Sequence, residues 1–240
     1  MKTRLVVKIG TSTLTGGTDR ISRGKVEDIA RQLHRLKDTY DVVLVSSGAI
    51  ATARQFINIK GWEKLVSSKQ AMSAIGQPKL MQIYSEVFKD FELNIAQCLM
   101  TYRDFENKES RLNTFNTIQE LLSHNYIPII NENDTVAVEE LVLGDNDKLS
   151  ALIAALIHAD ILIIASDVDG LFDKNPNIYK EAKLITEISD KGSVRAGPSI
   201  FNTEIGGPAH VALHLLLIRN LFRNLRNCRP DQEKGDFLCA

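Results

Sequence analysis

Short apolar runs alternate with longer amphipathic stretches along this chain. The longer stretches place apolar residues at three- and four-residue spacing, which predicts helices that bury one face. They cover residues 26–36, 69–88, 112–122 and 149–157. The short runs are continuously apolar and predict strands that are buried on both faces. They cover residues 5–9, 42–45, 95–100, 127–130 and 161–165.

The alternation of these elements predicts an α/β fold. Strands separated by helices favour a mostly parallel sheet with helices covering both of its faces. The 240 residues of the chain are enough for one large α/β domain or two small ones. Residues 136–143 alternate less cleanly, and we expect them to form a hairpin beside the main sheet.

Composition and charge narrow the class of protein. The chain is 44% hydrophobic and 25% charged, which is typical of a soluble globular protein. Its net charge of −1, without a dense basic stripe, argues against a protein that binds nucleic acid. No apolar run reaches the roughly 18 to 20 residues that a membrane-crossing helix needs. The first ten residues lack the features of a signal peptide.

The cysteines indicate a reducing compartment. Their number, three, is odd, and the spacing of Cys98, Cys228 and Cys239 fits no metal-binding pattern. We therefore expect a cytoplasmic protein in which Cys98 belongs to the apolar core.

Two polar clusters lie on either side of a short segment in the middle of the chain. Residues 131–134 read Asn-Glu-Asn-Asp and follow a predicted strand, and residues 145–147 read Asp-Asn-Asp and precede a predicted helix. Open α/β sheets bind ligands at such strand ends. Amides donate and accept hydrogen bonds whereas carboxylates only accept, so together they suit a small molecule with an ammonium and a carboxylate group. The turn and cap residues of an ordinary hairpin would give the same pattern.

A lysine lies near the end of the first predicted strand. Lys8 is followed by a loop of small residues that begins with Gly10, Thr11 and Ser12. Glycine lets backbone amides approach a phosphate, and lysine supplies a positive charge. The order differs from that of a P-loop, because the lysine precedes the glycine. A surface lysine before a turn fits the pattern equally well.

Two further strand ends carry small or polar residues. Ser47 and Gly48 follow the strand 42–45, and Ser166 and Asp167 follow the strand 161–165. A helix that begins at such a turn offers unpaired amides to an anion. Alternatively, Ser47 is only an N-cap residue and the second segment is only a turn. The ends of parallel strands share one edge of a sheet, so a lysine loop beside an Asn/Asp pocket indicates phosphoryl transfer to a small zwitterionic acceptor.

Five motifs resemble those of the amino-acid kinase family. They are VVKIGTSTLTGG (residues 6–17), VVLVSSGAIA (42–51), SKQAMSAIGQPKLMQ (68–82), PIINENDTVAVEELVLGDNDKLSAL (128–152) and SDVDGLFDKNP (166–176). The resemblance covers roughly residues 1–188. The lysine loop and the last motif are shared widely in the family, whereas INEND together with GDNDxLSA is specific to its glutamate 5-kinase branch. This pair argues against a sister kinase that acts on aspartate, acetylglutamate, carbamate or a nucleoside monophosphate.

The resemblance implies a three-layer αβα sandwich. In this single domain, residues 1–158 would bind the acceptor and residues 159–240 the nucleotide. It implies transfer of the γ-phosphoryl group of ATP, with Mg²⁺, to the side-chain carboxylate of L-glutamate, which gives glutamyl 5-phosphate for proline synthesis. It further implies a homo-oligomer and feedback inhibition by L-proline at the glutamate site. The chain is too short for the extra C-terminal domain that some members carry, so it resembles the kinase domain alone.

The resemblance also implies roles for particular residues. Lys8 and Asp147 would be catalytic, and Asp147 would lie near Mg²⁺ together with Asp145. The acceptor would be held by Ser47, Gly48, Asp134 and Asn146. The nucleotide would be held by Lys8, Gly10, Thr11, Ser12, Ser166, Asp167, Gly206 and Gly207.

The resemblance ends after about residue 188. The family has a GTGGMxTK segment that wraps the ATP phosphates, and the nearest candidate here is EIGGPAHV at residues 204–211. Pro208 would remove an amide donor, and Val211 stands in the place of the lysine. Residues 209–225 predict a helix. Three interpretations stay open: a working lobe in which Arg195 or Arg219 replaces the lysine, an enzyme crippled by a reading-frame change or splice variant, and a ligand-binding relative without catalysis.

Overall fold

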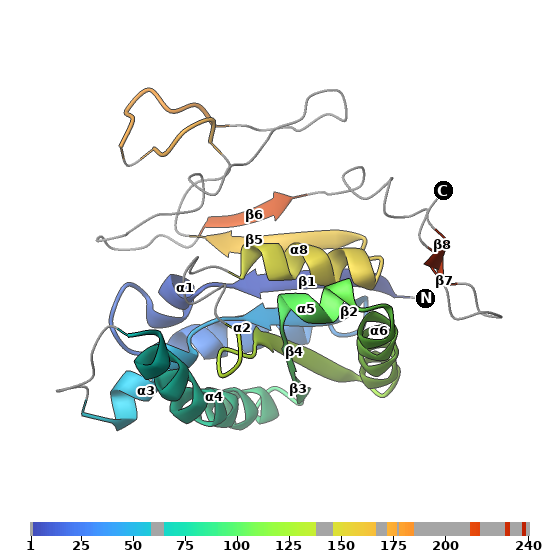
Figure 1. Cartoon of the computed structure of the whole chain (residues 1–240), viewed down its shortest axis with the longest axis horizontal. Helices are drawn as coiled ribbons and strands as arrows, with labels where there is room; N and C mark the ends of the chain where they lie inside the picture. Colours follow the sequence, from blue (N-terminus) through green and yellow to red (C-terminus); the bar gives the residue numbers. More distant parts are fainter. Residues whose placement is uncertain are drawn as a thin grey trace.

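A computed structural model of the chain describes residues 2–58, 65–137, 146–166, 172–176 and 178–184, together with the backbone of residues 212–216, 229–230 and 237–238. Within them a six-stranded sheet has the order β3-β4-β2-β1-β5-β6 (Figure 1). Its strands are β1 (Thr3–Ile9), β2 (Tyr40–Ser46), β3 (Asn94–Met100), β4 (Tyr126–Glu132), β5 (Ile161–Ser166) and β6 (Ala212–Leu216). Strands β1 to β5 are parallel to one another, and β6 is antiparallel to β5. The mostly parallel sheet expected from the sequence is confirmed. A separate short pair is formed by β7 (Arg229–Pro230) and β8 (Phe237–Leu238).

Each face of the sheet carries its own apolar core, because successive side chains of a strand point to opposite faces. On β1, Leu5, Val7 and Ile9 belong to a core shared with α2 and α4, whereas Val6 belongs to a core shared with α6 and α8. The helices on the first face are α1 (Thr11–Thr15), α2 (Arg23–Leu36), α3 (Ala49–Phe56) and α4 (Val66–Lys89). Those on the second face are α5 (Tyr102–Glu106), α6 (Lys108–Ser123) and α8 (Asp147–Leu156). The three-layer αβα sandwich is therefore confirmed (Figure 1).

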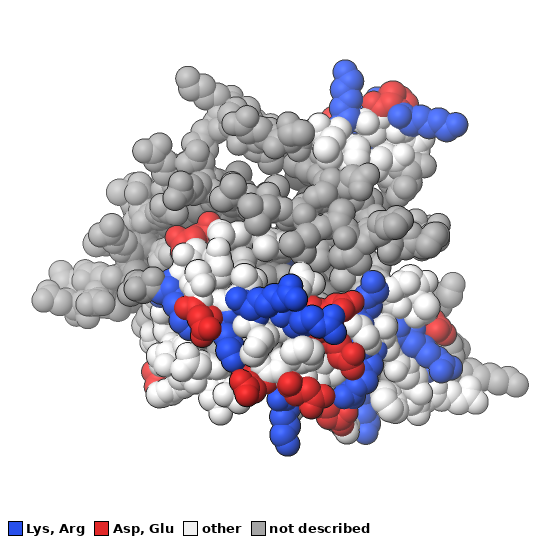
Figure 2. All heavy atoms as spheres, turned by 180° about the vertical axis from the view of Figure 1, so that it is seen from behind, with Lys and Arg blue, Asp and Glu red and all other residues white. Residues whose placement is uncertain are grey.

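Charged residues of both signs cover the outer surface of the first helix layer. Arg23 of α2 contacts Glu27 of the same helix at 3.4 Å and Glu86 of α4 at 3.2 Å. Exposed pairs of this kind typically contribute less than about 1 kcal/mol each. On the face shown in Figure 2, the coloured Lys and Arg residues are interspersed with Asp and Glu. None of the helices in the described residues is both long and apolar enough to cross a membrane.

Two expectations about burial and secondary structure need correction. The run 95–100 predicts a buried strand, but β3 lies at the edge of the sheet and six of its seven residues are partly or largely exposed, including Leu99 at 42%. Cys98 is accordingly only half-buried, although it packs against the second core and its burial raises the pKa of its thiol. A continuous apolar run does not reveal whether a strand has a neighbour on both sides.

The second correction concerns residues 209–225, which predict a helix. Residues Ala212–Leu216 instead form β6, paired with β5 from Ser166↔Ala212 to Leu162↔Leu216. A short apolar run fits a buried helix or a strand equally well. The backbone N–H and C=O groups on the free side of β5 need hydrogen-bond partners, and a paired strand supplies them. The expected hairpin at 136–143 lies outside the described residues beyond Ala137.

Helices α3 and α4 approach each other through a glycine. A Cβ atom on Gly76 of α4 would lie 1.8 Å from the carbonyl oxygen of Ala49 and 2.8 Å from the backbone nitrogen of Ala53, both in α3. Only glycine permits this contact, because the obstacle is backbone rather than a flexible side chain. The contact matters for the ligand site because Ala49 begins α3 directly after the end of β2.

We expect Gly76→Ala to destabilise the fold by at least about 1–3 kcal/mol, since the added methyl group overpacks a rigid backbone contact. Gly24→Ala is the matched control. Gly24 lies in α2, and nothing beyond its chain neighbours comes closer than 3.8 Å to a Cβ added there. The control is expected to be neutral or to stabilise by about 0.4–1 kcal/mol. Urea unfolding followed by circular dichroism measures both, and equal midpoints for the two variants would contradict the helix contact.

Candidate active site

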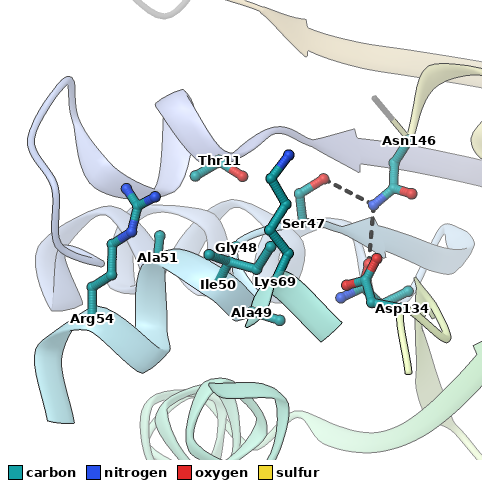
Figure 3. A pocket seen from close by; sticks show the side chains of 11 residues that line it. Thr11, Ser47, Gly48, Ala49, Ile50, Ala51, Arg54, Lys69, Asp134 and Asn146 are labelled. Atoms are coloured by element: carbon teal, nitrogen blue, oxygen red, sulfur yellow. Dashed lines mark hydrogen bonds between the residues drawn. The ribbon is translucent and has the colours of Figure 1, made fainter. Parts of the chain in front are cut away.

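Polar strand ends meet at one edge of the sheet. The register pairs Ile9 with both Ser46 and Ala165, and Val45 with Ile130, so the chain segments that leave β1, β2, β4 and β5 start side by side. A pocket of about 280 Å³ opens there (Figure 3). Its polar lining consists of Thr11, Ser47, Arg54, Lys69, Asn131, Asp134 and Asn146. The expectation that these segments share one edge is confirmed by the register.

Lys8 forms a close ion pair with Asp147. Its Nζ lies 2.5 Å from Oδ1 of Asp147, and only 7% of Lys8 is exposed. A buried ammonium group needs such a partner, because burying an unpaired charge is very costly. The alternative of an ordinary surface lysine is therefore wrong. Lys8 belongs to β1 and Asp147 opens α8, so the pair joins two of the converging segments.

The loop after β1 leaves room beside this ammonium group. Gly10 caps α1 at its N-terminus, and a Cβ on Gly10 would lie 3.4 Å from Nζ of Lys8. Thr11 and Ser12 form the first turn of α1, and Thr11 lines the pocket. The small residues of this loop thus let another group come close to the Lys8 ammonium.

The side-chain amide of Asn146 connects three segments of the chain. Its Nδ2 donates to the carbonyl oxygen of Ser46 at 2.9 Å, to Oγ of Ser47 at 2.8 Å and to Oδ1 of Asn131 at 3.0 Å. Asn146 is 1% exposed. Because the amide nitrogen only donates, the hydroxyl of Ser47 must accept here, which leaves the Ser47 proton available to an acceptor in the pocket.

The N-cap interpretation of Ser47 is wrong. The residue that caps α3 is Gly48, which has a φ of +104°. A side chain is strained at this φ, and a Cβ would come within 3.1 Å of Ile21. The sharp turn at Gly48 frees the Ser47 side chain from the helix and allows it to line the pocket beside Asn146 (Figure 3).

Asp134 supplies negative charge to the pocket. Oδ2 of Asp134 accepts a 2.6 Å hydrogen bond from the hydroxyl of Ser73 in α4. Burial raises the pKa of the Asp134 carboxyl above its usual range, and the Ser73 hydrogen bond opposes this rise. A partly desolvated carboxylate gains from a cation, so this position suits the ammonium group of a ligand.

A model of the amino acid kinase family matches residues 3–193. The chain belongs to the amino acid kinase family. It is 46% identical over 188 residues to the glutamate 5-kinase of Thermoanaerobacter sp. (strain X514), a match covering 78% of this chain and 50% of that protein. It is 44% identical over 184 residues to the glutamate 5-kinase of Helicobacter hepaticus, covering 77% and 69%. It is 41% identical over 210 residues to that of Haemophilus influenzae (strain PittGG), covering 86% and 57%.

The chain therefore spans between half and about two thirds of the length of these curated relatives. Among solved structures, UMP kinase from Ureaplasma parvum is similar with a TM-score of 0.53 and 18% identity, over 77% of this chain and 75% of that one. At this identity the likeness shows the amino acid kinase fold alone.

The structure brings together most of the residues predicted for the family's site. Lys8 and Asp147 form a pair, and Ser47, Asp134 and Asn146 surround one pocket with Gly48 at its turn. The backbone of Ser166 ends β5. Asp145, Asp167, Gly206 and Gly207 lie outside the described residues. Among the described residues, no group of three or more His, Cys, Asp or Glu side chains is arranged to hold a metal ion.

Sequence reasoning missed two basic residues of the pocket. Arg54 of α3 and Lys69 of α4 line it; in Figure 3 Arg54 lies across the pocket from Asp134, and Lys69 rises between them. Arg54 lies three residues after Ala51, one helical turn further along the same face of α3, and this spacing was a signal in the sequence. The two cations complement a ligand that carries a carboxylate.

The raised pKa of Asp134 predicts a gain of stability in Asp134→Asn at pH 7. The native carboxyl holds its proton more tightly than the unfolded one, so stability falls as pH rises through the usual Asp range to the raised folded pKa. The asparagine removes this loss and keeps an oxygen that accepts from Ser73. We expect a higher Tm for the variant at pH 7 and a smaller difference as the pH is lowered into the range where Asp134 is protonated. Equal melting curves at every pH would contradict the assignment.

Proposed function

We propose that this protein transfers the γ-phosphoryl group of ATP to the side-chain carboxylate of L-glutamate, forming glutamyl 5-phosphate, the first committed step of proline synthesis. One observation carries the proposal: the Lys8–Asp147 pair lies at the same sheet edge as a pocket with charges of both signs. The similarity to glutamate 5-kinases of three bacteria supports it. Amino acid kinase membership alone would leave the acceptor open.

The acceptor pocket suits a free amino acid. L-Glutamate carries one ammonium and two carboxylate groups at neutral pH. Asp134 is placed to pair with the ammonium group, while the Ser47 hydroxyl and the cations Arg54 and Lys69 suit carboxylate oxygens. A volume of about 280 Å³ is at the small end of ligand pockets, which favours an amino acid over a nucleoside monophosphate.

Lys8 and Asp147, at the same edge of the sheet as the pocket, suit phosphoryl transfer. A carboxylate oxygen of glutamate forms a bond to the γ-phosphorus while the bond from that phosphorus to the β–γ bridging oxygen breaks, and ADP leaves. The carboxylate is already ionised, so the step needs no general base. It needs positioning and neutralisation of charge on the phosphoryl oxygens. Lys8 is proposed to supply that positive charge, and Asp147 holds its ammonium group in place.

The nucleotide and the metal complete the proposal. Mg²⁺ is usually held by one or two carboxylates and by the phosphates of the substrate, so Asp147 fits as one ligand, with Asp145 as the second. When bound, the ion would neutralise phosphate charge. Gly10, Thr11 and Ser12 are proposed to approach the phosphates, and Ser166, Asp167, Gly206 and Gly207 to contact the nucleotide. A cytoplasmic location, a homo-oligomer and inhibition by L-proline at the acceptor pocket follow from the same family assignment as proposals.

An acceptor panel tests the function. With ATP and Mg²⁺, L-glutamate is expected to give an acyl phosphate that hydroxylamine traps. Glutarate lacks the ammonium group, 4-aminobutanoate lacks the α-carboxylate and L-aspartate is one methylene shorter. Each should react at least about tenfold more slowly, because each leaves a polar or charged pocket group without its partner or misplaces the reacting carboxylate. Product from another acceptor but none from L-glutamate would contradict the proposal.

Asp147→Asn tests the role of the buried pair. The side chain keeps its size and one oxygen near Lys8, so the fold is expected to remain, as measured by circular dichroism, with a lower Tm because the buried ammonium group loses its charged partner. The rate of phosphoryl transfer should fall by about 10²–10³, the loss typical of one misplaced charge-stabilising group. Asp28→Asn, which changes an exposed partner of Arg31 on α2, is the control and should keep the full rate. A full rate for Asp147→Asn would rule out the catalytic role.

A second candidate is a protein that binds glutamate without turning ATP over. The family match ends at residue 193, before Gly206 and Gly207, and this observation favours it. Calorimetry separates the two candidates. Binding of L-glutamate without binding of an ATP analogue would support the second candidate, whereas micromolar ATP binding with turnover would exclude it.

A further inference from the structure

Helix α4 presents three polar side chains to the interior of the protein. Ser73, Gln77 and Tyr84 are 4%, 7% and 0% exposed. Their spacings of four and seven residues place them on one face of the helix. None of them lines the ligand pocket, yet each makes a hydrogen bond to a residue that lines it or to that residue's neighbour.

Ser73 acts on the carboxylate of the pocket. Its hydroxyl donates to Oδ2 of Asp134 at 2.6 Å. The hydrogen bond restricts one oxygen of Asp134, so the other oxygen is the one with more freedom to meet a ligand cation. Ser73 therefore fixes which way the negative charge faces.

Gln77 determines the orientation of a neighbouring amide. Its Oε1 accepts from Nδ2 of Asn131 at 2.8 Å, so the opposite atom of that amide, Oδ1, faces Nδ2 of Asn146 at 3.0 Å. The backbone amide of Glu132 also donates to this Oδ1, at 2.9 Å. If Asn131 were flipped, donors would face donors at Asn146 and Glu132. Gln77 thus orients Asn131, which in turn helps to orient Asn146.

Tyr84 acts on the turn that carries Ser47. The hydroxyl of Ser46 donates to the carbonyl oxygen of Ser47 at 3.0 Å, so it accepts from the hydroxyl of Tyr84, which lies 2.9 Å away. Tyr84 packs edge-to-face against Phe88 with ring centroids 5.4 Å apart. Burial raises the pKa of the Tyr84 phenol, which keeps its proton on the oxygen.

We propose that Ser73, Gln77 and Tyr84 are positioning residues that set the affinity of the acceptor pocket without touching the ligand. Through them a single helix holds Asp134, Asn146 and Ser47 in their mutual arrangement. Gly76, on the same helix, brings the start of α3 against α4 by direct backbone contact. This positioning role rests on the proposed function in one respect: the binding assay uses L-glutamate as the ligand.

Gln77→Met and Tyr84→Phe test it by removing polar atoms at nearly constant volume. The Kd for L-glutamate, measured by calorimetry, is expected to rise about tenfold in each, as one misplaced hydrogen-bonding group costs about 1–1.5 kcal/mol. The Tm should fall by only a few degrees. Gln82→Met, on the exposed face of α4, and Tyr40→Phe, at the far end of β2, are the matched controls and should bind like the wild type. Equal affinities of test and control variants would overturn the proposal.

A double-mutant cycle separates positioning from a general structural effect. If Tyr84 acts through the Ser47 turn, Tyr84→Phe should weaken binding less than twofold when Ser47→Ala is already present, because the two changes affect one contact. An undiminished tenfold effect in that background would show that Tyr84 acts elsewhere and would overturn its assigned role.

A measurement without ligand distinguishes failure of this proposal from failure of the proposed function. In ¹⁵N-labelled protein, the side-chain amide resonances of Asn131 and Asn146 are expected to shift in Gln77→Met and to stay in place in Gln82→Met. If the wild type does not bind L-glutamate, the function is wrong, and the resonances still decide the positioning role. Unchanged resonances in Gln77→Met would overturn it.

Discussion

The Nδ2 group of Asn146 donates to oxygen atoms from the end of β2, from the residue that follows it and from the end of β4. These segments are close because their strands are parallel neighbours, but the sheet alone does not fix the side chains beyond the last backbone pair. One buried amide performs that task, and it does so at the first residue before α8, next to Asp147. Asn146 of the acceptor pocket and Asp147 of the Lys8–Asp147 pair are consequently adjacent residues. A shift of this segment would therefore move the ligand pocket and the Lys8 ammonium group together.

The sequence predicted the central strands because their environment is uniform. The four runs that became β1, β2, β4 and β5 are buried by helices on both faces, and continuous apolar character follows directly from that burial. The same rule failed for β3 and for residues 212–216. Whether β3 lies at the edge of the sheet depends on residues that are distant in the chain. The same is true of whether residues 212–216 pair with β5, and the local spacing of apolar residues reveals neither.

The candidate site likewise contains residues that the sequence predicted and residues that it did not. The polar residues at strand ends were predictable, because few structural reasons place an Asn-Glu-Asn-Asp cluster directly after a buried strand, and the motifs pointed to the same positions. The alternatives for Lys8 and Ser47 could be separated only by burial and by the cap geometry at Gly48. Gln77 belongs to the motif at residues 68–82 and Tyr84 lies just beyond it, but the sequence assigned a role to neither. A glutamine or tyrosine among apolar helix residues is ordinary until its hydrogen-bond partner is known.

The inner face of α4 has a consequence for how such a pocket changes over evolutionary time. Gln77 and Tyr84 alternate along this face with Leu80, Val87 and Phe88, which fill the larger apolar core. A substitution that alters the volume of this face would shift the groups that select the acceptor. Selection for the right substrate therefore also limits which core substitutions are tolerated on this face of α4. A change of substrate would in turn require compensating changes in the core.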